Sequence, residues 1–131
     1  MNKRVIVVTG ANRGIGQEIC RQLAKLDLTV VLTARHQKNG LEAVADFKKQ
    51  KLSLRFHPLD VTNSAQILKL TEFLKEEFGR CDGLVNNAGI FLESKDGNFF
   101  NTDLAVIHQT METNVYGPYL LCQSSMPLPR F

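Results

Sequence analysis

The chain alternates short apolar runs with longer stretches in which apolar residues recur every three or four positions. The run Arg4–Thr9 (RVIVVT) is rich in β-branched residues and leads into a glycine, as expected for a buried strand of a parallel sheet. From Gly14 to Leu26 the apolar side chains follow the spacing of one helix face. Thr29–Thr33 (TVVLT) then has the pattern of a second buried strand. The chain therefore opens with a predicted strand, helix and strand.

The alternation continues over the rest of the chain. The further predicted elements are a helix around 41–47, a weaker strand over 52–57, a helix that stops at Gly79, a strand over 83–86 and a long helix that Pro127 and Pro129 end. Asn63 or Ser64 is suited to cap the third helix. Thr102 or Asp103 is suited to cap the fourth. Strands that alternate with helices predict one α/β domain over residues 1–131, a three-layer Rossmann-type doubly wound parallel sheet that stops after about four strands and four helices.

A glycine-rich loop, TGANRGIG, joins the first predicted strand to the first helix. Gly10 permits a tight turn, Gly14 lets the backbone approach phosphate oxygens, and Gly16 lets the helix pack closely on the strand. The N–H groups and the positive dipole end of the helix would then face the anion. Because the loop lacks the GK[ST] sequence of an ATP- or GTP-binding P-loop, it predicts a dinucleotide site. The expected cofactor-binding residues of the loop are Thr9, Gly10, Asn12, Arg13, Gly14, Ile15 and Gly16.

Two arginines favour a phosphorylated dinucleotide. In dinucleotide-binding folds, an acidic residue after the second strand holds the 2′-hydroxyl of NAD, whereas an arginine accommodates the 2′-phosphate of NADP. Positions 33–36 contain Arg35 and no Asp or Glu, and Arg13 lies within the glycine loop. Two guanidinium groups that converge on one phosphate form a strong site. The sequence therefore predicts NADP(H) as the cofactor; the alternative is that both arginines are exposed and structural.

Four motifs, in this order and spacing, resemble those of the classical short-chain dehydrogenases/reductases. They are Thr9-Gly10-x-x-x-Gly14-x-Gly16, Asp60-Val61, Asn86-Asn87-Ala88-Gly89 and Asn114. The similarity covers essentially the whole chain, and TGANRGIG, VVLTAR and TNVYG are most similar to the carbonyl-reductase branch. The resemblance implies an oxidoreductase that transfers a hydride between NADP(H) and a small carbonyl or alcohol substrate. It also implies that this chain is the N-terminal, dinucleotide-binding portion of such a domain.

The resemblance further implies roles for individual residues after the third and fourth strands. Asp60 would accept a hydrogen bond from the adenine amino group, with Val61 beside the ring; a helix-capping role for Asp60 is the alternative. Asn87, Ala88 and Gly89 would lie under the cofactor ribose, at the end of the fourth strand. A mainly structural role, bonding neighbouring strands, is equally open for the asparagines of this motif.

The resemblance also indicates what the chain lacks. The family's chemistry needs a tyrosine for the substrate proton and a lysine four residues later, because a tyrosine with a pKa near 10 is poorly matched to neutral pH. Tyr116 and Tyr119 are the only tyrosines, and neither has a lysine at that spacing. Asn114, which would interrupt the fourth helix and anchor a proton-relay water, is the one catalytic residue present. We expect the chain to be catalytically incomplete; the alternative is a non-catalytic short form that binds cofactor or a partner.

A fold that ends after the fourth helix would leave apolar surface uncovered. The fourth strand would form an open sheet edge, which invites pairing with another chain. The fourth helix would expose Leu104, Ile107, and either Leu120 or Leu121. We therefore expect marginal stability and, as partners, a second copy in a homo-oligomer or a full-length relative.

Composition narrows the remaining possibilities. Hydrophobic residues make up 44% of the 131 residues and charged residues 22%, as in an ordinary globular domain. The net charge of +3 gives little reason to expect nucleic acid or a membrane as a partner. No apolar stretch has the length of a signal peptide or a membrane span. The three cysteines and three histidines lack metal-ligand spacing, so we expect no metal site and reduced thiols in a cytoplasmic protein.

Overall fold

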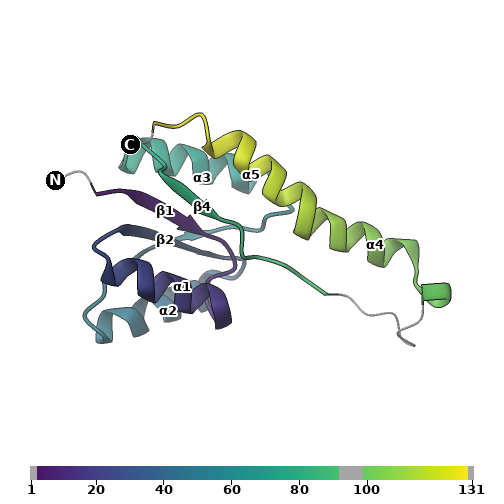
Figure 1. The fold of residues 1–131 in the computed structure, drawn as a ribbon, viewed down its shortest axis with the longest axis horizontal. Helices are drawn as coiled ribbons and strands as arrows, with labels where there is room; N and C mark the ends of the chain where they lie inside the picture. The colour runs from purple at the N-terminus through teal and green to yellow at the C-terminus, as the bar shows by residue number, and fades with distance from the viewer. Residues whose placement is uncertain (1–2, 92–98, 130–131) are drawn as a thin grey trace.

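The computed structural model of the chain describes residues 3–91 and 99–129 (Figure 1). Its strands are β1 (Val5–Val8), β2 (Thr29–Ala34), β3 (Arg55–Pro58) and β4 (Gly83–Val85). Its helices are α1 (Gly14–Lys25), α2 (Gln37–Lys49), α3 (Ser64–Glu77), α4 (Leu104–Met111) and α5 (Gly117–Ser125), with a 3₁₀ turn at Phe99–Asn101 and a π-helical turn at Glu112–Tyr116. The strands form one parallel sheet in the order β3-β2-β1-β4.

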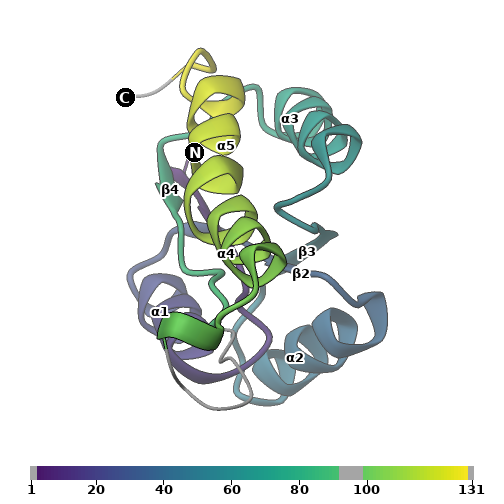
Figure 2. The same ribbon diagram turned by 90° about the vertical axis from the view of Figure 1, so that its right-hand side faces the viewer.

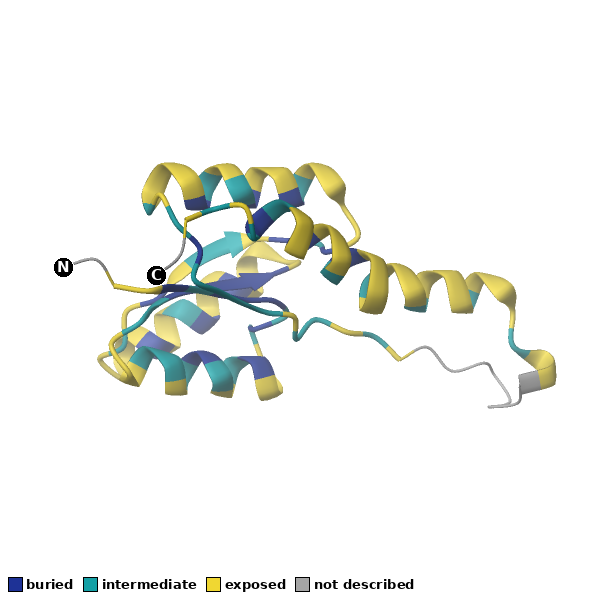
Figure 3. Ribbon diagram, turned by 45° about the horizontal axis from the view of Figure 1, so that its top comes forward, coloured by how far each residue is buried: buried dark blue, intermediate teal, exposed yellow. Residues whose placement is uncertain are grey.

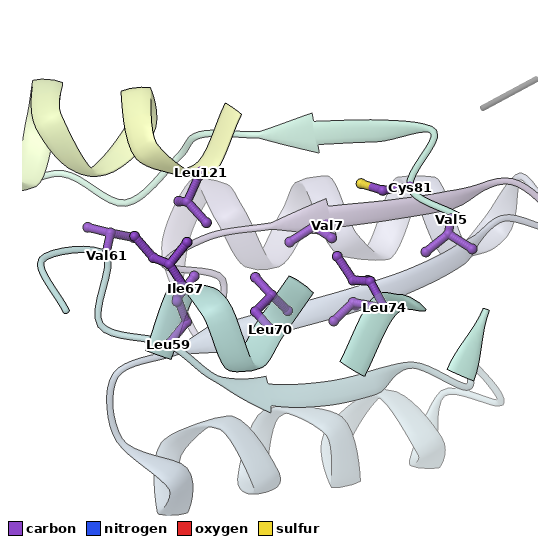
Figure 4. Packing of buried hydrophobic residues seen from close by; sticks show 10 residues of the cluster. Val5, Val7, Leu59, Val61, Ile67, Leu70, Leu74, Cys81 and Leu121 are labelled. Atoms are coloured by element: carbon purple, nitrogen blue, oxygen red, sulfur yellow. The ribbon is translucent and has the colours of Figure 1, made fainter. Parts of the chain in front are cut away.

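Helices cover both faces of this sheet, with α1 and α2 on one face and α3 and α5 on the other (Figure 2). Side chains alternate along the central strands, so Val7 and Val31 pack on the α3 and α5 side, whereas Val8 and Leu32 pack on the α1 and α2 side. Figure 4 shows the first of these two clusters, where Leu121 of α5 meets the side chains of α3 and β1. The predicted three-layer α/β fold is confirmed.

Side-chain caps begin two of the helices. Asn63 Oδ1 accepts the backbone N–H of Gln66 at 3.1 Å, which makes Asn63 and not Ser64 the cap of α3. Asp103 Oδ1 accepts the N–H of Ala105 at 3.2 Å at the start of α4. The structure thus decides both pairs that the sequence left open, in favour of Asn63 and Asp103.

The third strand is shorter than the sequence predicts. The expected strand starts at 52, but β3 starts at Arg55. Lys51 adopts a left-handed conformation (φ +63°), and the Leu52 N–H donates to the carbonyl of Phe47 at 2.9 Å. These residues therefore close the end of α2 before the strand begins. The hydrophobic pattern alone does not reveal such a turn, because Leu52 and Leu54 look like strand residues.

The long fourth helix that the sequence predicts is divided. α4 and α5 are joined by the π-helical turn, in which the Gly117 N–H donates to the carbonyl of Glu112. Pro118 accounts for the break, since proline has no N–H and its ring clashes with the carbonyl four residues earlier, that of Asn114. A widened π-helical turn removes this clash without ending the helical path.

α4 extends beyond the sheet, and none of its side chains is buried (Figure 3). Leu104 is 62% exposed and Ile107 is 46% exposed, as the sequence predicts. Of the two leucines between which the sequence does not decide, Leu120 is 38% exposed and Leu121 is fully buried, because one face of α5 packs on α3 and the sheet. Within the described residues, β4 pairs with β1 and no strand pairs with its other edge.

Candidate functional site

The carboxyl ends of all four strands meet at one edge of the sheet, where the connecting segments enclose a cleft of about 750 Å³. β2 and β3 lie on one side of β1, and β4 lies on the other. The ends of β1 and β4 are therefore the topological switch point at which open α/β sheets bind ligands. Ten residues predicted to bind a cofactor line the cleft: Gly10, Asn12, Arg13, Gly14, Arg35, Asp60, Val61, Asn87, Ala88 and Gly89.

The glycine loop has the geometry that a phosphate cradle requires. Gly10 (φ +57°) and Gly14 (φ +61°) adopt left-handed conformations that favour glycine. A Cβ on Gly10 would lie 2.9 Å from the Cα of Ala88, so the loop closely approaches the segment after β4. A Cβ on Gly14 would meet no atom within 4 Å, so this part of the loop backbone is open for a ligand.

Gly16 contributes to the cleft indirectly, because it is absent from the lining. A Cβ there would lie 2.4 Å from Asn87 Nδ2 and 2.8 Å from the carbonyl oxygen of Gly10. The close contact that this glycine permits is thus between α1 and the loop together with Asn87, whereas the sequence analysis assigned it to the packing of helix on strand. A side chain at position 16 would push α1 away from the loop.

The N-terminus of α1 has no capping side chain. Its N-cap residue is Arg13, which is extended (φ −158°, ψ 169°) and makes no side-chain hydrogen bond to the helix. No acidic residue stands in the first turn, which includes the 76% exposed Ile15. The positive end of the helix dipole and the first N–H groups are therefore uncompensated by the protein. A bound phosphate would compensate both this dipole and the Arg13 charge, so the residues present fit an anionic ligand.

Thr9 and Asn87 join the ends of β1 and β4 beneath the loop. Thr9 is 1% exposed and does not line the cleft, and its Oγ1 accepts the N–H groups of Asn87 at 3.0 Å and Ala88 at 2.9 Å. The Asn87 side chain donates to the carbonyls of Thr9 at 3.1 Å and Gly10 at 3.0 Å. Asn87 thus connects the ends of β1 and β4, and the exposed Asn86 donates to Cys122 Sγ at 3.7 Å.

A second wall of the cleft lies at the ends of β2 and β3. Arg35 directly follows β2 and lines the same cavity as Arg13. Asp60 follows β3, and its Oδ1 accepts the backbone N–H of Thr62 at 2.9 Å and the Thr62 hydroxyl at 2.7 Å. Since Asn63 caps α3, Asp60 closes a local turn and does not cap the helix. The turn holds one carboxylate oxygen of Asp60 and orients the group at the cleft.

Asn114 lies in the π-helical turn and holds the segment after β4. Its Oδ1 accepts the Ile90 N–H at 2.9 Å, and its Nδ2 donates to the Ile90 carbonyl at 2.8 Å. A Cβ on Gly89 would lie 3.4 Å from Asn114 Oδ1, so the two segments are in close contact. This pairing uses one N–H group and one lone pair of the amide and fixes Asn114 beside the segment after β4, whereas Asn114 itself is absent from the cleft lining.

Part of the cleft wall does not follow from the sequence motifs. The further lining residues are His36, Asn39, Leu59, Thr62, Ile90, Gln109, Glu112 and Thr113. His36 and Asn39 lie within one helical turn of Arg35, and that adjacency is a signal that could have identified them. Gln109 and Glu112 come from α4 and the π-helical turn, and no spacing in the sequence reveals that this segment borders the cleft.

Among the described residues outside the cleft, burial is the main cause of a shifted pKa at Cys20 and His57. Burial raises the pKa of the Cys20 thiol to about 12. Burial also lowers the pKa of His57, although its ring contacts the carbonyl of Pro58 at 2.8 Å. In residues 3–91 and 99–129, His, Cys, Asp and Glu side chains form no group of three that could hold a metal ion. No helix in these same ranges combines the length and apolar character that crossing a membrane requires.

The sequence of the chain is similar to those of known proteins. Residues 4–129 match the family described as short chain dehydrogenase. (+)-Neomenthol dehydrogenase of Arabidopsis thaliana is 44% identical in an alignment 144 residues long, and the match covers 95% of this chain and 49% of that protein. Carbonyl reductase (NADPH) 1 of Rattus norvegicus is 42% identical over 128 residues, which cover 97% of this chain and 45% of that protein. The chain spans about half the length of these curated relatives.

Solved structures show the same fold. The crystal structure of a metagenomic short-chain oxidoreductase in complex with NADP is similar with a TM-score of 0.84 at 34% identity, over 95% of this chain and 55% of that one. A short-chain dehydrogenase from Streptomyces avermitilis gives a TM-score of 0.85 at 30% identity, over 98% of this chain and 45% of that one. From its motifs, its sheet order and these relatives, the chain belongs to the short-chain dehydrogenase family.

Proposed function

We propose that this chain binds NADP(H) in the cleft at the carboxyl edge of its sheet and prefers it to NAD(H). The observation that carries the proposal is that Arg13 and Arg35 line one cavity with the open backbone of Gly14. The carboxylate that would hold the 2′-hydroxyl of NAD is missing from positions 33–36. NADPH in the name of the rat carbonyl reductase and NADP in the metagenomic crystal structure support this choice.

Different residues of the cleft would bind different parts of the cofactor. The backbone of the glycine loop and the N-terminus of α1 would hold the pyrophosphate. Arg13 and Arg35 would bind the 2′-phosphate. Asp60 would accept a hydrogen bond from the adenine amino group, and Val61 would lie beside the adenine ring. The segment from Asn87 to Gly89 would lie under the ribose, where Thr9 fixes its position.

Replacement of Arg35 tests the cofactor preference. In Arg35→Gln, we expect the affinity for NADPH to fall about 10- to 100-fold, the range for loss of a charge-assisted hydrogen bond, with little change for NADH. Fluorescence titration of both nucleotides measures it. Lys48→Gln, which removes an exposed cation at the far end of α2, serves as the matched control. Equal affinity of the unmodified chain for NADH and NADPH would contradict the proposal.

We further propose that the whole fold carries out oxidoreduction of a small carbonyl or alcohol, and that these 131 residues are catalytically incomplete as they stand. Hydride transfer is the chemistry that the nicotinamide supplies when bound. Asn114 would anchor a proton-relay water, but neither Tyr116 nor Tyr119 has a lysine four residues later. We expect no oxidation of NADPH by this chain with a panel of small carbonyl compounds. Turnover with any of them would overturn the second part of the proposal.

A non-catalytic, partner-binding form is the second candidate. The exposed apolar side chains of α4 and the open edge of β4 favour it, because such surfaces associate with other chains. The occupant would be a second copy or a full-length relative. The free thiols of Cys20 and Cys122 support a reducing, cytoplasmic setting. Light scattering over a range of concentrations tests self-association, and a monomer throughout would exclude the second copy.

A further inference from the structure

His36 brings a third group of potential positive charge to the cleft. Arg13 comes from the glycine loop, Arg35 from the end of β2 and His36 from the start of α2, and all three line the same cavity. Histidine differs from arginine because its charge changes between about pH 5 and 8, whereas a guanidinium stays charged. The cleft therefore contains two permanent cations and one that depends on pH.

The imidazole of His36 is available for a ligand. His36 is the N-cap residue of α2, but its side chain makes no capping hydrogen bond, and the residue is exposed. Its backbone alone starts the helix, since the carbonyl accepts the Gly40 N–H at 3.1 Å. No acidic residue stands in the first turn of α2 to pair with a protonated ring. Among the described residues, the ring thus caps no helix at the position where it borders the cleft.

Charged side chains of both signs line the cleft together with His36. Besides the two arginines, the cleft lining contains Asp60 and Glu112, and Lys38 shares the first turn of α2. The strand β3, against which α2 packs, also has charged or titratable side chains, but these are engaged elsewhere: Arg55 pairs with Glu77, and His57 lies against the Phe73 ring. Asp60 is held in its turn with Thr62.

We propose that His36 is a specificity-determining residue whose protonated ring adds to the attraction of Arg13 and Arg35 for the 2′-phosphate. NADPH then gains affinity over NADH as the pH falls from 8 to 6, because a protonated imidazole is a cation and a neutral one is not. This inference rests on the proposed NADP(H) site and adds a pH-dependent component to its cofactor choice.

The experiment compares the unmodified chain with His36→Gln by titration of NADPH and NADH at pH 8 and pH 6. The 2′-phosphate itself titrates near pH 6. Each result is therefore expressed as the Kd of His36→Gln divided by the Kd of the unmodified chain, because protonation of the phosphate affects both values. We expect the NADPH ratio to rise from near 1 at pH 8 to about 3 at pH 6, the effect of one exposed charge pair. The NADH ratio stays near 1 at both.

Lys38→Gln is the matched control, because Lys38 has a permanent charge in the same helical turn and is absent from the cleft lining. Its NADPH ratio should be the same at both pH values. A His36→Gln ratio that does not change between pH 8 and 6 overturns the inference and leaves the cofactor proposal intact. Absence of NADPH binding at both pH values overturns the two together.

Discussion

The two walls of the cleft differ in how firmly they are packed. The N-terminal unit, β1 to β3 with α1 and α2 (residues 5–58), has a continuous core: five of the six positions in β2 are buried, and Cys20 and Phe47 attach α1 and α2 to the sheet. In the C-terminal arm (residues 104–125), α4 has no buried side chain, yet Gln109 and Glu112 border the cleft. The wall that carries the glycine loop is thus part of the core, whereas α4 on the opposite wall has no buried side chain and is joined to the core through the π-helical turn and α5.

The attachments of the C-terminal arm are local and specific. Asn114 makes two hydrogen bonds to the Ile90 backbone. A Cβ on Gly117 would lie 2.7 Å from the carbonyl oxygen of Val61, so glycine permits close contact between α5 and the loop after β3. The arm is therefore fixed next to the cleft at its π-helical turn, and α4 projects from that point.

The largest expected difference in stability is between a substitution in the core of the N-terminal unit and one at an exposed position of the C-terminal arm. Phe47 is fully buried, so Phe47→Ala should lower the free energy of unfolding by about 3–5 kcal/mol. Leu104→Ala should change it by less than about 0.5 kcal/mol, because Leu104 is largely exposed. Urea denaturation measures both. A loss above about 1 kcal/mol for Leu104→Ala would mean that another chain covers α4, and the comparison would fail.

The next effect concerns the connection between the N-terminal unit and β4. Thr9→Val removes the oxygen that accepts the N–H groups of Asn87 and Ala88, so we expect a loss of about 2–4 kcal/mol. Thr9→Ser keeps this oxygen and should lose no more than about 1 kcal/mol, the value of one buried methyl group. Thermal unfolding of the pair gives the difference. Equal losses would show that the methyl group matters and the hydrogen bonds do not.

Alanine substitutions at two glycines of the loop test how closely α1 packs against the loop and Asn87. Gly16→Ala should lower stability by about 1–3 kcal/mol, because the new methyl group would overlap Asn87 and the Gly10 carbonyl. Gly14→Ala has room for its methyl group and should cost about 1 kcal/mol from its left-handed backbone alone. Chemical denaturation ranks the two variants. If Gly14→Ala is the less stable, the contact of α1 with Asn87 is not what Gly16 permits.

The smallest effect is a gain within the arm. Ser125 Oγ is buried and has no hydrogen-bond partner among the described residues, so Ser125→Ala should raise stability by about 1 kcal/mol. Ser124→Ala is the control with the opposite sign, since Ser124 Oγ lies 2.6 Å from Thr71 Oγ1 and its removal leaves that hydroxyl without this contact. Thermal unfolding separates a gain from a loss. A loss for Ser125→Ala would mean that its hydroxyl finds a partner in solution.

The sequence by itself determined the elements of the N-terminal unit and the character of the glycine loop. Strands β1 and β2 and helix α1 follow from hydrophobic spacing within a few residues, and glycine at positions 10 and 14 permits the left-handed backbone that the structure has there. These are local properties, so local patterns reveal them. The resemblance to the short-chain dehydrogenases supplied the roles expected of the later motifs, which spacing alone does not reveal.

Only the tertiary structure decided what depends on contacts between distant segments. The pairing of Thr9 with Asn87 joins residues 78 positions apart, and the burial of Leu121 beside an exposed Leu120 depends on how α5 meets α3. The same holds for Glu112, which borders the cleft because the arm returns to it at the π-helical turn. Such contacts are fixed by packing of the whole fold, and no local pattern encodes them.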